Sequence, residues 1–292
     1  MPRVLTIAVP NLNGELYLEL TLKSLNSQGD SLRWWLQDGG SSDRSLAIAK
    51  QLKRSQDTIV SEPDSGQTDA LNRAFSRMGG EIVGYVNSDD ILQPGAAEKV
   101  LDFFERNPDV DLVYGGVEYL DAAGDSMGLH HGEISNVSEI LDIYDVWWQG
   151  RQWVQPEVFW RRSLAAKTGN FDGRYHLAFD YDYWVRCFMA GAKVSGIPDL
   201  LAGFRKHGAQ KSANSRLAAD EIRDSVGRHL GFLPLWKRMK LAARLGYDRY
   251  QLLPPEKKKN MGYALLQNPE WLLAPEVWHR IKISIGSCLS AR

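Results

Sequence analysis

The sequence predicts an α/β protein in which a mostly parallel sheet is flanked by helices and followed by a helical C-terminal extension. Two observations support this fold class. Apolar, β-branched segments alternate with helical patterns over residues 1–116, and helical patterns broken by prolines fill residues 213–292. Strands that alternate with helices of this length are typical of βαβ units, which build parallel sheets.

Five strands are predicted from short apolar runs. They cover residues 4–10, 33–37, 57–61, 81–86 and 111–114. The first, VLTIAVP, is apolar and β-branched, as expected for a strand buried on both faces of a parallel sheet. Each of the first four is followed by polar or turn-forming residues, which mark the point where the chain leaves the sheet.

Helical patterns separate these strands. In the first of them, Leu18, Leu22 and Leu25 form one apolar stripe. The second ends near residue 52, and either Ser42 or Asp43 can cap its start. Further helices are predicted over residues 68–78, 94–107 and 180–189.

The composition is that of a folded domain rather than a disordered chain, because 43% of the residues are apolar and 24% are charged. The two cysteines, Cys187 and Cys288, have no metal-ligand spacing and favour a reducing compartment. No apolar run is long enough to cross a bilayer, and the first strand begins too early to leave room for a signal peptide. We therefore expect a cytoplasmic protein.

The net charge of −1 hides a strong asymmetry along the chain. Residues 1–203 hold 18 Lys and Arg against 29 Asp and Glu, a charge of −11, whereas residues 204–292 hold 17 against 7, a charge of +10. The acidic part suits metal and substrate chemistry, and the basic part suits anionic partners. The alternative is that the basic part packs on the acidic part and neutralises it.

Acidic and amide side chains gather at the carboxyl ends of the first four strands. They are Asn11, Asp38, Glu62, Asp64, Asp89 and Asp90. Each alone is an ordinary turn residue, but ligands of open α/β sheets bind at this edge, so their coincidence at four successive strand ends indicates a site. Carboxylates such as Asp89 are hard oxygen ligands that suit Mg²⁺ or Mn²⁺.

The sequence also lacks two phosphate-binding motifs. Neither G-x-G-x-x-G nor G-x-x-x-x-G-K-[ST] occurs, which argues against a dinucleotide-binding Rossmann enzyme and a P-loop nucleotide hydrolase. We therefore expect phosphates to be held through a metal ion on carboxylates rather than by a glycine-rich loop.

Seven strings, in their order and spacing, resemble the family-2 inverting glycosyltransferases of the GT-A fold, of the bacterial polysaccharide-assembly type. They are VPNLN (9–13), QDGGSSDRS (37–45), SEPDSGQTDALNRAF (61–75), GGEIVGYVNSDDIL (79–92), QPEVFWRR (155–162), FDYDYWVR (179–186) and FRKHGAQKS (204–212). The resemblance implies a GT-A-like catalytic domain over residues 1–212, with a nucleotide-sugar-binding half (1–116) and an acceptor and catalytic-base half (117–212). It does not extend to the basic helical extension, residues 213–292.

The function that the resemblance implies is metal-dependent transfer of a hexosyl or related sugar to an acceptor hydroxyl, with inversion. The implied donor is a nucleotide-diphosphate sugar, preferably a UDP sugar, and the implied acceptor is a saccharide or a lipid-linked molecule in cell-surface polysaccharide or glycolipid assembly. Nucleic acid is not an implied partner.

The resemblance also implies roles for single positions. Asp180 takes the place of the catalytic base, and Asp89 and His207 take the places of metal ligands for Mg²⁺ or Mn²⁺. Two positions depart from the family pattern, because Asn87 replaces the first acid of the D-x-D string and Phe179 replaces the Glu of the E-D string. The positions implied around the nucleotide and donor sugar are Pro10, Asn11, Asn13, Asp38, Glu62, Asp64, Gly66, Gln67, Asp69, Asn72, Asn87, Ser88, Asp90 and Gln155.

The two acids of the FDYDYW string are two residues apart, so on a helix they point to different sides. We expect Asp180 to face the site and Asp182 to cap or solvate the helix. From the residues alone, Asp180 is also a candidate N-cap. The aromatic faces of Trp147, Trp148, Trp153 and Trp160 can stack on sugar rings, although at least half of them are expected in the core.

Two other functions are compatible with parts of the sequence. A catalytically silent nucleotide-sugar-binding scaffold is favoured by the replacement of two acids by Asn87 and Phe179. A nucleotidyltransferase is less compatible, because it needs a basic, glycine-rich loop after the first strand, where this chain has VPNLNGELY.

The extension contains a basic amphipathic pattern. An apolar stripe is predicted from Leu235, Met239, Ala242 and Leu245, surrounded by Lys237, Arg238, Lys240 and Arg244, with Lys257, Lys258 and Lys259 as a second basic cluster and Trp236, Trp271 and Trp278 nearby. Such a pattern predicts peripheral binding to an anionic membrane surface. The alternatives are packing of the stripe on the catalytic domain or on a second subunit of a homo-oligomer.

Overall fold

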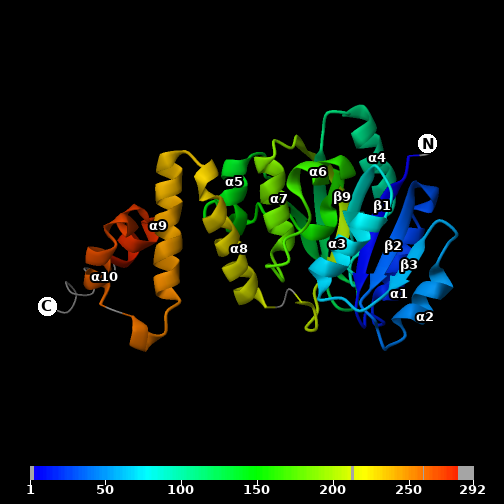
Figure 1. Ribbon diagram of the computed structural model, residues 1–292, viewed down its shortest axis with the longest axis horizontal. Helices are drawn as coiled ribbons and strands as arrows, with labels where there is room; N and C mark the ends of the chain where they lie inside the picture. The colour runs from blue at the N-terminus through cyan, green and yellow to red at the C-terminus, as the bar shows by residue number, and fades with distance from the viewer. Residues whose placement is uncertain (1–2, 212–213, 259, 282–292) are drawn as a thin grey trace. The chain divides into compact units, whose positions relative to one another are not determined.

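A computed structural model describes residues 3–211, 214–258 and 260–281. The chain forms two compact units, Met1–Ile222 and Arg223–Arg292. The division falls inside helix α8 (Ser215–His229), ten residues beyond the 212/213 boundary expected from the sequence. Figure 1 labels helices α1 to α10 and strands β1, β2, β3 and β9.

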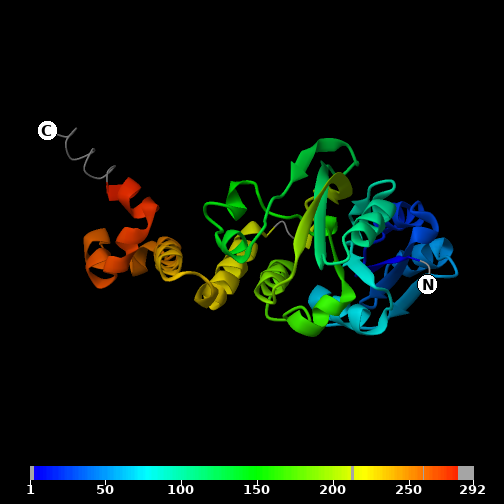
Figure 2. The same cartoon turned by 90° about the horizontal axis from the view of Figure 1, so that it is seen from above.

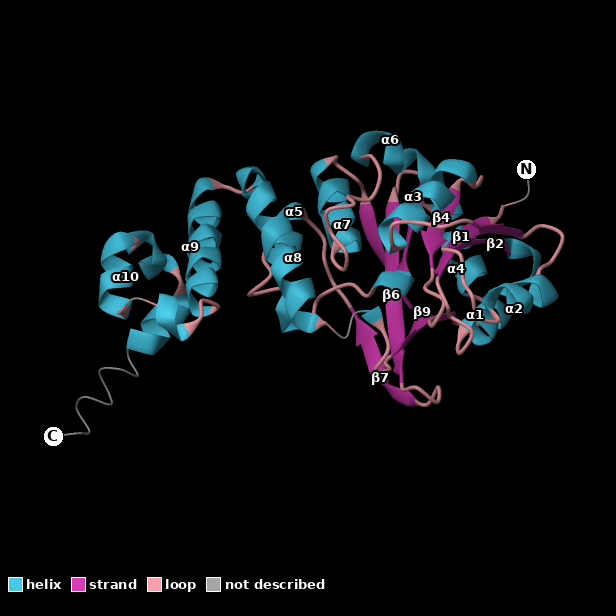
Figure 3. Ribbon diagram, turned by 60° about the horizontal axis from the view of Figure 1, so that its bottom comes forward, coloured by secondary structure: helices cyan, strands magenta, loops and turns pink. Residues whose placement is uncertain are grey.

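A nine-stranded sheet forms the centre of the first unit. Its strands are β1 (Leu5–Asn11), β2 (Leu32–Asp38), β3 (Thr58–Ser61), β4 (Ile82–Tyr85), β5 (Ile91–Leu92), β6 (Leu112–Leu120), β7 (Ser126–His131), β8 (Val158–Arg161) and β9 (Val194–Arg205). They are arranged in the order β3-β2-β1-β4-β8-β6-β9-β5, with β7 paired to β6. Figure 3 shows β6, β7 and β9 side by side at one end of the sheet.

The predicted parallel arrangement is confirmed for β1 to β4. The rest of the sheet is mixed, because β8 runs antiparallel to β4 and β6, and β5 and β7 are also antiparallel to their neighbours. Strands β5, β7, β8 and β9 were not predicted. Strands β5 and β8 are only two and four residues long, β7 is largely exposed, and β9 alternates irregularly between buried and exposed positions around Gly196 and Pro198.

Helices cover both faces of this sheet (Figure 2). They are α1 (Leu18–Asn26), α2 (Ser45–Leu52), α3 (Gln67–Arg77), α4 (Ala96–Arg106), α5 (Val137–Leu141), α6 (Ala165–Thr168) and α7 (Phe179–Met189). The predicted stripe of Leu18, Leu22 and Leu25 is fully buried, in one core cluster with residues of β1, β2, α2 and α4. Burying each such side chain stabilises the fold by about 1.5–3 kcal/mol.

A second cluster, made of aromatic rings, joins α3 and α7 to the sheet. Phe171 packs against Tyr85 of β4, Trp160 of β8 and Phe179 of α7, with ring centroids 5.5–6.3 Å apart. Because α7 carries the expected base and Tyr85 ends a central strand, this packing places the start of α7 beside the carboxyl end of β4.

Strand register brings the polar strand ends together. Asn11 at the end of β1 pairs with Asp38 at the end of β2, and Asp38 pairs with Ser61 at the end of β3. The edge of the sheet that the sequence marks as a site is therefore formed by neighbouring residues.

The second unit is helical and has its own small core. Beyond α8 it contains α9 (Leu235–Gln251) and α10 (Met261–Gln267), and Tyr247, Ala264 and Trp271 are among the residues of its core cluster. No helix within the described residues is both long and apolar enough to span a membrane. Cys288 and Lys259 lie outside the described residues.

The predicted apolar stripe of α9 divides between core and surface. Leu245 is buried, whereas Leu235 and Met239 are 62% and 47% exposed. Trp236 and Trp278 are exposed, but Trp271 packs in the core. The exposed apolar residues of α9 therefore gather in its N-terminal half.

Candidate active site

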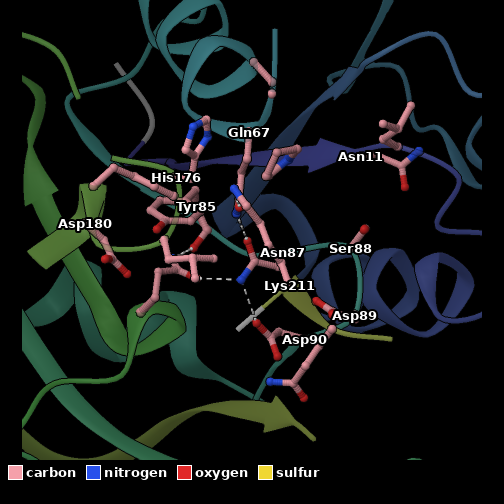
Figure 4. Close-up of a pocket in the computed structure, with 18 of the residues that line it drawn as sticks. Asn11, Gln67, Tyr85, Asn87, Ser88, Asp89, Asp90, His176, Asp180 and Lys211 are labelled. Atoms are coloured by element: carbon pink, nitrogen blue, oxygen red, sulfur yellow. Dashed lines mark hydrogen bonds between the residues drawn. The ribbon is translucent and has the colours of Figure 1, made fainter. Parts of the chain in front are cut away.

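A cavity of about 440 Å³ lies at the carboxyl ends of β1 and β4. Eleven of the residues that the sequence assigns to the site line it: Pro10, Asn11, Asp64, Gly66, Gln67, Asn87, Ser88, Asp89, Asp90, Gln155 and Asp180. Figure 4 shows Asp180 on one side of this cavity and Asp89 on the other, with Asn87 between them. Residues that are far apart in sequence therefore converge on one site.

A smaller polar cavity of about 240 Å³ shares four residues with the first. The shared residues are Gly66, Gln67, His176 and Lys211. Two more predicted residues, Asp69 and Asn72, line this second cavity. Both belong to α3, which begins directly after Gly66, whose φ of 123° is a conformation that favours glycine.

Asp89 and His207 form a pair at the first cavity. Nε2 of His207 lies 3.0 Å from Oδ2 of Asp89. The imidazole also packs on the ring of Tyr17, with 4.7 Å between centroids. The backbone N–H of His207 donates to Oε1 of Gln210. His207 does not itself line the cavity, so it reaches the site through Asp89.

Asn87, which stands where the family pattern has an acid, organises the loop that holds Asp89. Its amide nitrogen donates to Oδ2 of Asp90 at 3.1 Å and to Oε1 of Gln155 at 3.3 Å, and its amide oxygen accepts from Nε2 of Gln67 at 2.7 Å. A carboxylate at this position could accept the hydrogen bond from Gln67 but could not donate the two to Asp90 and Gln155. The amide therefore serves a structural purpose that an acid would not.

Asp90 is 1% exposed and also has a structural environment. Its Oδ1 accepts the backbone N–H of Arg205 at 2.9 Å, which ties the loop to the end of β9. Burial, together with the neighbouring charge of Asp89, raises the pKa of Asp90 well above its ordinary value. Asp89 is therefore the more accessible carboxylate of the two.

Asp180 is the second residue of α7 and lines the cavity. Burial raises the pKa of this carboxyl from 3.8 to about 6, although hydrogen bonding from the backbone and the positive charge of Lys211 oppose the shift. A carboxylate with a pKa in this range can accept a proton near neutral pH. Its Oδ1 accepts the N–H of Tyr181 at 2.7 Å.

Asp182 is neither a cap nor solvated, which corrects the expectation from the sequence. It is 1% exposed, and its Oδ2 accepts from Nε of Arg186 at 2.8 Å. The guanidinium, four residues later on the same helix, compensates the buried charge. The two acids of the FDYDYW string do point to different sides, with only Asp180 at the cavity.

Asp38 is fully buried beneath the loop that follows β2. Its two oxygens accept hydrogen bonds from Asn11, Ser41 and Ser61 and from the backbone N–H groups of Gly40 and Ser41. Burial raises the pKa of Asp38, but these hydrogen bonds outweigh burial and hold it below its ordinary value. Asp38 does not line the cavity; it fixes Asn11, which does.

Three further predicted residues stabilise the walls. Asn13, with a positive φ of 52°, accepts the N–H of Ser42 at 2.9 Å and so joins the loops after β1 and β2. Glu62 accepts from Nη1 of Arg77 at 2.7 Å. Asn72 forms two 3.0 Å hydrogen bonds with the backbone of Phe171, which links α3 to the chain before α7.

The four tryptophans are mainly core residues. Trp147, Trp153 and Trp160 are buried and Trp148 is 37% exposed, which confirms that at least half are in the core. None of the four is among the described residues that line the two cavities. A role in stacking on sugar rings at these cavities is therefore not supported.

Among the cavity residues that were not singled out from the sequence are three with titratable side chains, Tyr85, His176 and Lys211. Lys211 donates to Oε1 of Gln67 at 3.1 Å and lies 5.7 Å from the ring centre of Phe179. Lys211 belongs to the FRKHGAQKS string, in which only His207 was assigned a role from the sequence. Tyr85 lies in the GGEIVGYVNSDDIL string at the end of a predicted strand, but no role was assigned to it. His176 has no local sequence signal, because tertiary packing brings it to the cavity.

The donor set fits a divalent ion that is shared with substrate. No group of three or more His, Cys, Asp or Glu side chains that could hold a metal occurs within residues 3–211, 214–258 and 260–281. One carboxylate and one imidazole at 3.0 Å are nevertheless a plausible pair for an ion completed by water and phosphate oxygens, since such ions use few protein ligands in phosphate sites.

Comparison with known proteins agrees with this geometry. The family model described as "Glycosyl transferase family 2" matches residues 6–169. An uncharacterized glycosyltransferase of Methanocaldococcus jannaschii is 24% identical over 196 residues, which cover 65% of this chain and 66% of that protein. The chain thus spans slightly less than two thirds of that relative.

Two solved structures share the fold. Residues 1–349 of TarS from S. aureus, in complex with UDP-GlcNAc, have a TM-score of 0.64 at 15% identity and cover 92% of this chain and 78% of that one. Glucosyl-3-phosphoglycerate synthase of Mycobacterium tuberculosis, in complex with Mn²⁺, UDP and glucosyl-3-phosphoglycerate, has a TM-score of 0.54 at 18% identity, covering 80% and 82%. The GT-A-like fold expected from the sequence is therefore confirmed.

Proposed function

Because the chain belongs to glycosyl transferase family 2, we propose that it transfers a sugar from a nucleotide-diphosphate sugar to an acceptor hydroxyl with inversion. The observation that carries the proposal is the placement of Asp89 and Asp180 on opposite sides of one cavity. One carboxylate is then available to the diphosphate and the other to the acceptor.

The reaction that this arrangement suits is a single displacement. The bond between the anomeric carbon and the diphosphate oxygen breaks, and the electron pair stays on the diphosphate. The acceptor oxygen bonds to the anomeric carbon from the opposite face and gives its proton to Asp180, a step for which general-base catalysis is typically worth about 10²–10⁴-fold. Attack from the face opposite the leaving group inverts the anomeric configuration.

Asp89 and His207 would hold a divalent ion, Mn²⁺ or Mg²⁺. When bound, such an ion stabilises the negative charge of a departing diphosphate without transfer of a proton. The related synthase from M. tuberculosis was solved with Mn²⁺ and UDP, and the TarS structure with a UDP sugar. We therefore favour a UDP sugar as donor and a saccharide or lipid-linked acceptor.

A silent scaffold is less well supported than an enzyme. The two departures that favour it have structural explanations: Asn87 makes three hydrogen bonds in the loop, and Phe179 is 2% exposed within the aromatic cluster. Neither departure removes Asp89 or Asp180 from the cavity. A nucleotidyltransferase is not favoured, because the family match points to sugar transfer.

A peripheral location at a membrane is the second part of the proposal. Phe232, Leu235, Trp236 and Met239, here called the α9 surface, are 47–64% exposed. Arg238 is exposed beside them, and Lys237 lies 5.5 Å from the ring centre of Trp236. Exposed aromatic and apolar side chains beside basic ones are typical of helices that lie in the boundary of an anionic membrane.

The catalytic proposal is tested by nucleotide release. The protein is incubated with a panel of UDP and GDP sugars, with Mn²⁺, Mg²⁺ or EDTA, and free nucleotide diphosphate is measured. We expect release with at least one donor in the presence of metal, none from Asp89→Asn, and release reduced by about 10²–10⁴-fold from Asp180→Asn. Binding of a nucleotide sugar without turnover for any donor, with or without saccharide acceptors, would favour the scaffold instead.

A further inference from the structure

The start of α7 is held by a residue from another helix. The N-cap residue of α7, Ala178, has no side chain that can accept from the first-turn N–H groups. The carboxylate of Glu221, in α8, accepts three N–H groups that precede the first turn, those of His176 at 2.9 Å, Leu177 at 2.7 Å and Ala178 at 2.9 Å. Three consecutive backbone donors before the helix thus share one acceptor group.

This carboxylate is well placed to act as an anchor. Glu221 is 9% exposed, and hydrogen bonds from backbone N–H groups to a charged acceptor are stronger than those between neutral groups. A negative group at the start of a helix also interacts favourably with the helix dipole. Replacing it removes three hydrogen bonds from a segment that has no equivalent acceptor of its own.

The anchored segment is part of the cavity wall. His176, Leu177, Phe179 and Asp180 all line the first cavity, and Asp180 is two residues from Ala178. On its other side the segment is held by α3, where Oγ1 of Thr68 donates to the carbonyl of Tyr175 at 3.1 Å. The segment directly before Asp180 is therefore held from two sides, by α3 and by α8.

We propose that Glu221 is a positioning residue for transfer, which orients Asp180 by anchoring residues 176–178. This inference rests on the proposed function, because it gives Asp180 the role of base. The proposal also gives α8, a helix that was predicted to belong to the C-terminal extension, a role in the catalytic domain. Misplacement of a reacting group by about 1 Å can cost about 10²-fold in rate.

The charge of Glu221 has a second effect on the same site. The charged and titratable groups around Asp180 are Lys211, after β9, Glu221, on α8, and Tyr85, at the end of β4. Burial is the largest cause of the raised pKa of Asp180; Lys211 lowers that pKa and Glu221 raises it. Removing the Glu221 charge therefore moves the Asp180 titration toward lower pH.

The test separates position from charge with two variants and one control. Glu221→Gln keeps an acceptor oxygen but loses the charge, Glu221→Ala loses both, and Asp220→Asn removes the same charge from the neighbouring exposed position of α8. Amide hydrogen exchange of residues 175–181 is measured by mass spectrometry. The ionisation of Asp180 is followed by the ¹³C signal of its carboxyl group in aspartate-labelled protein, assigned with Asp180→Asn.

We expect faster exchange in residues 175–181 for both Glu221 variants and a lower titration midpoint of Asp180 in Glu221→Gln, with neither change in Asp220→Asn. Turnover with the donor found in the panel should fall about tenfold to a hundredfold in Glu221→Ala, with less change in the KM for the donor. If Glu221→Ala does not fold, the hydrogen exchange and the Asp180 titration midpoint of Glu221→Gln test the proposal.

Unchanged exchange and an unchanged midpoint in Glu221→Gln would overturn the positioning role. An absence of turnover in the wild-type protein would instead count against the proposed function. Exchange and titration do not depend on turnover, so the two failures are distinguishable.

Discussion

Nε2 of His207 and Oδ2 of Asp89 are 3.0 Å apart, although 118 residues separate them in the chain. The contact is not isolated. Arg205, two residues before the histidine, donates from Nε to the carbonyl of Asp89 at 3.1 Å and from its backbone N–H to Asp90. The end of β9 is thus joined to the loop after β4 at three points, which fixes the imidazole against the carboxylate.

This pair predicts how the metal should respond to substitution. Asp89→Asn should abolish metal-stimulated nucleotide release, because the amide is a much weaker ligand for a hard cation. His207→Ala should weaken Mn²⁺ binding in the presence of UDP by about tenfold or more. The Mn²⁺ affinity of each variant is measured from the electron paramagnetic resonance signal of the free ion, with Asp125→Asn, a change at an exposed acid, as the control. Wild-type Mn²⁺ affinity in both variants would show that the ion lies elsewhere.

Substitution of the two acids of α7, Asp180 and Asp182, should have different effects on activity and stability. Asp180→Asn should keep nucleotide binding and lose transfer by about 10²–10⁴-fold. Asp182→Asn should lower the free energy of unfolding, by roughly 3–5 kcal/mol if the buried charge of Arg186 is left uncompensated, and leave turnover per folded molecule nearly intact. Urea denaturation and single-turnover assays measure the two effects. A stable, inactive Asp182→Asn beside an active Asp180→Asn would reverse the assignment.

Activity should depend on pH through Asp180. The base must be ionised to accept a proton, and its pKa is raised to about 6. The rate should therefore rise with pH to a half-maximum near 6 and be nearly constant above about pH 7, until another group titrates. The acid limb of kcat/KM for the donor against pH, which reports pKa values of the free enzyme, checks this. An acid limb centred near 4 would mean that an ordinary, solvated carboxylate limits the rate.

The α9 surface should bind anionic vesicles. Flotation with vesicles that contain phosphatidylglycerol should recover the protein at low salt, and much less at high salt or with neutral vesicles, because each basic residue contributes about 1 kcal/mol near such a surface. The double variant Leu235→Ser with Trp236→Ser should lose most of the binding. Leu266→Ser, an equally apolar change at an 80% exposed position of α10, is the matched control. No flotation of the wild-type protein at low salt would remove the membrane from the proposal.

The part of the fold that local pattern determines was predictable. Strands β1 to β4 have clear apolar patterns, and the polar residues predicted at their ends converge, because Asn11, Asp64 and Asp89 line one cavity. The roles of individual acids were less predictable. The spacing of Asp182 and Arg186, four residues apart on one helix, was a local signal for their ion pair. The sequence did not show that Asp182 is buried, because burial depends on how the helix packs in the fold.

Contacts across long sequence separations had no local signal. His176 comes from an irregular segment, and Glu221 reaches that segment from 43–45 residues further along the chain. Residue 221 was placed in the extension because the family resemblance ends at residue 212. Its three bonds to backbone N–H groups follow from packing, which periodicity does not describe.

The burial of Asp180 has a cost that should be visible in evolution. With a pKa of 3.8 in the unfolded chain and about 6 in the fold, its ionised form opposes folding at neutral pH by a free energy on the order of 3 kcal/mol, and this penalty appears as pH rises from about 4 to 6. A neutral amide of the same shape avoids it. Homologues that have lost the transferase reaction would therefore be expected to carry Asn at this position. They would also be expected to be more heat-stable than the active enzymes.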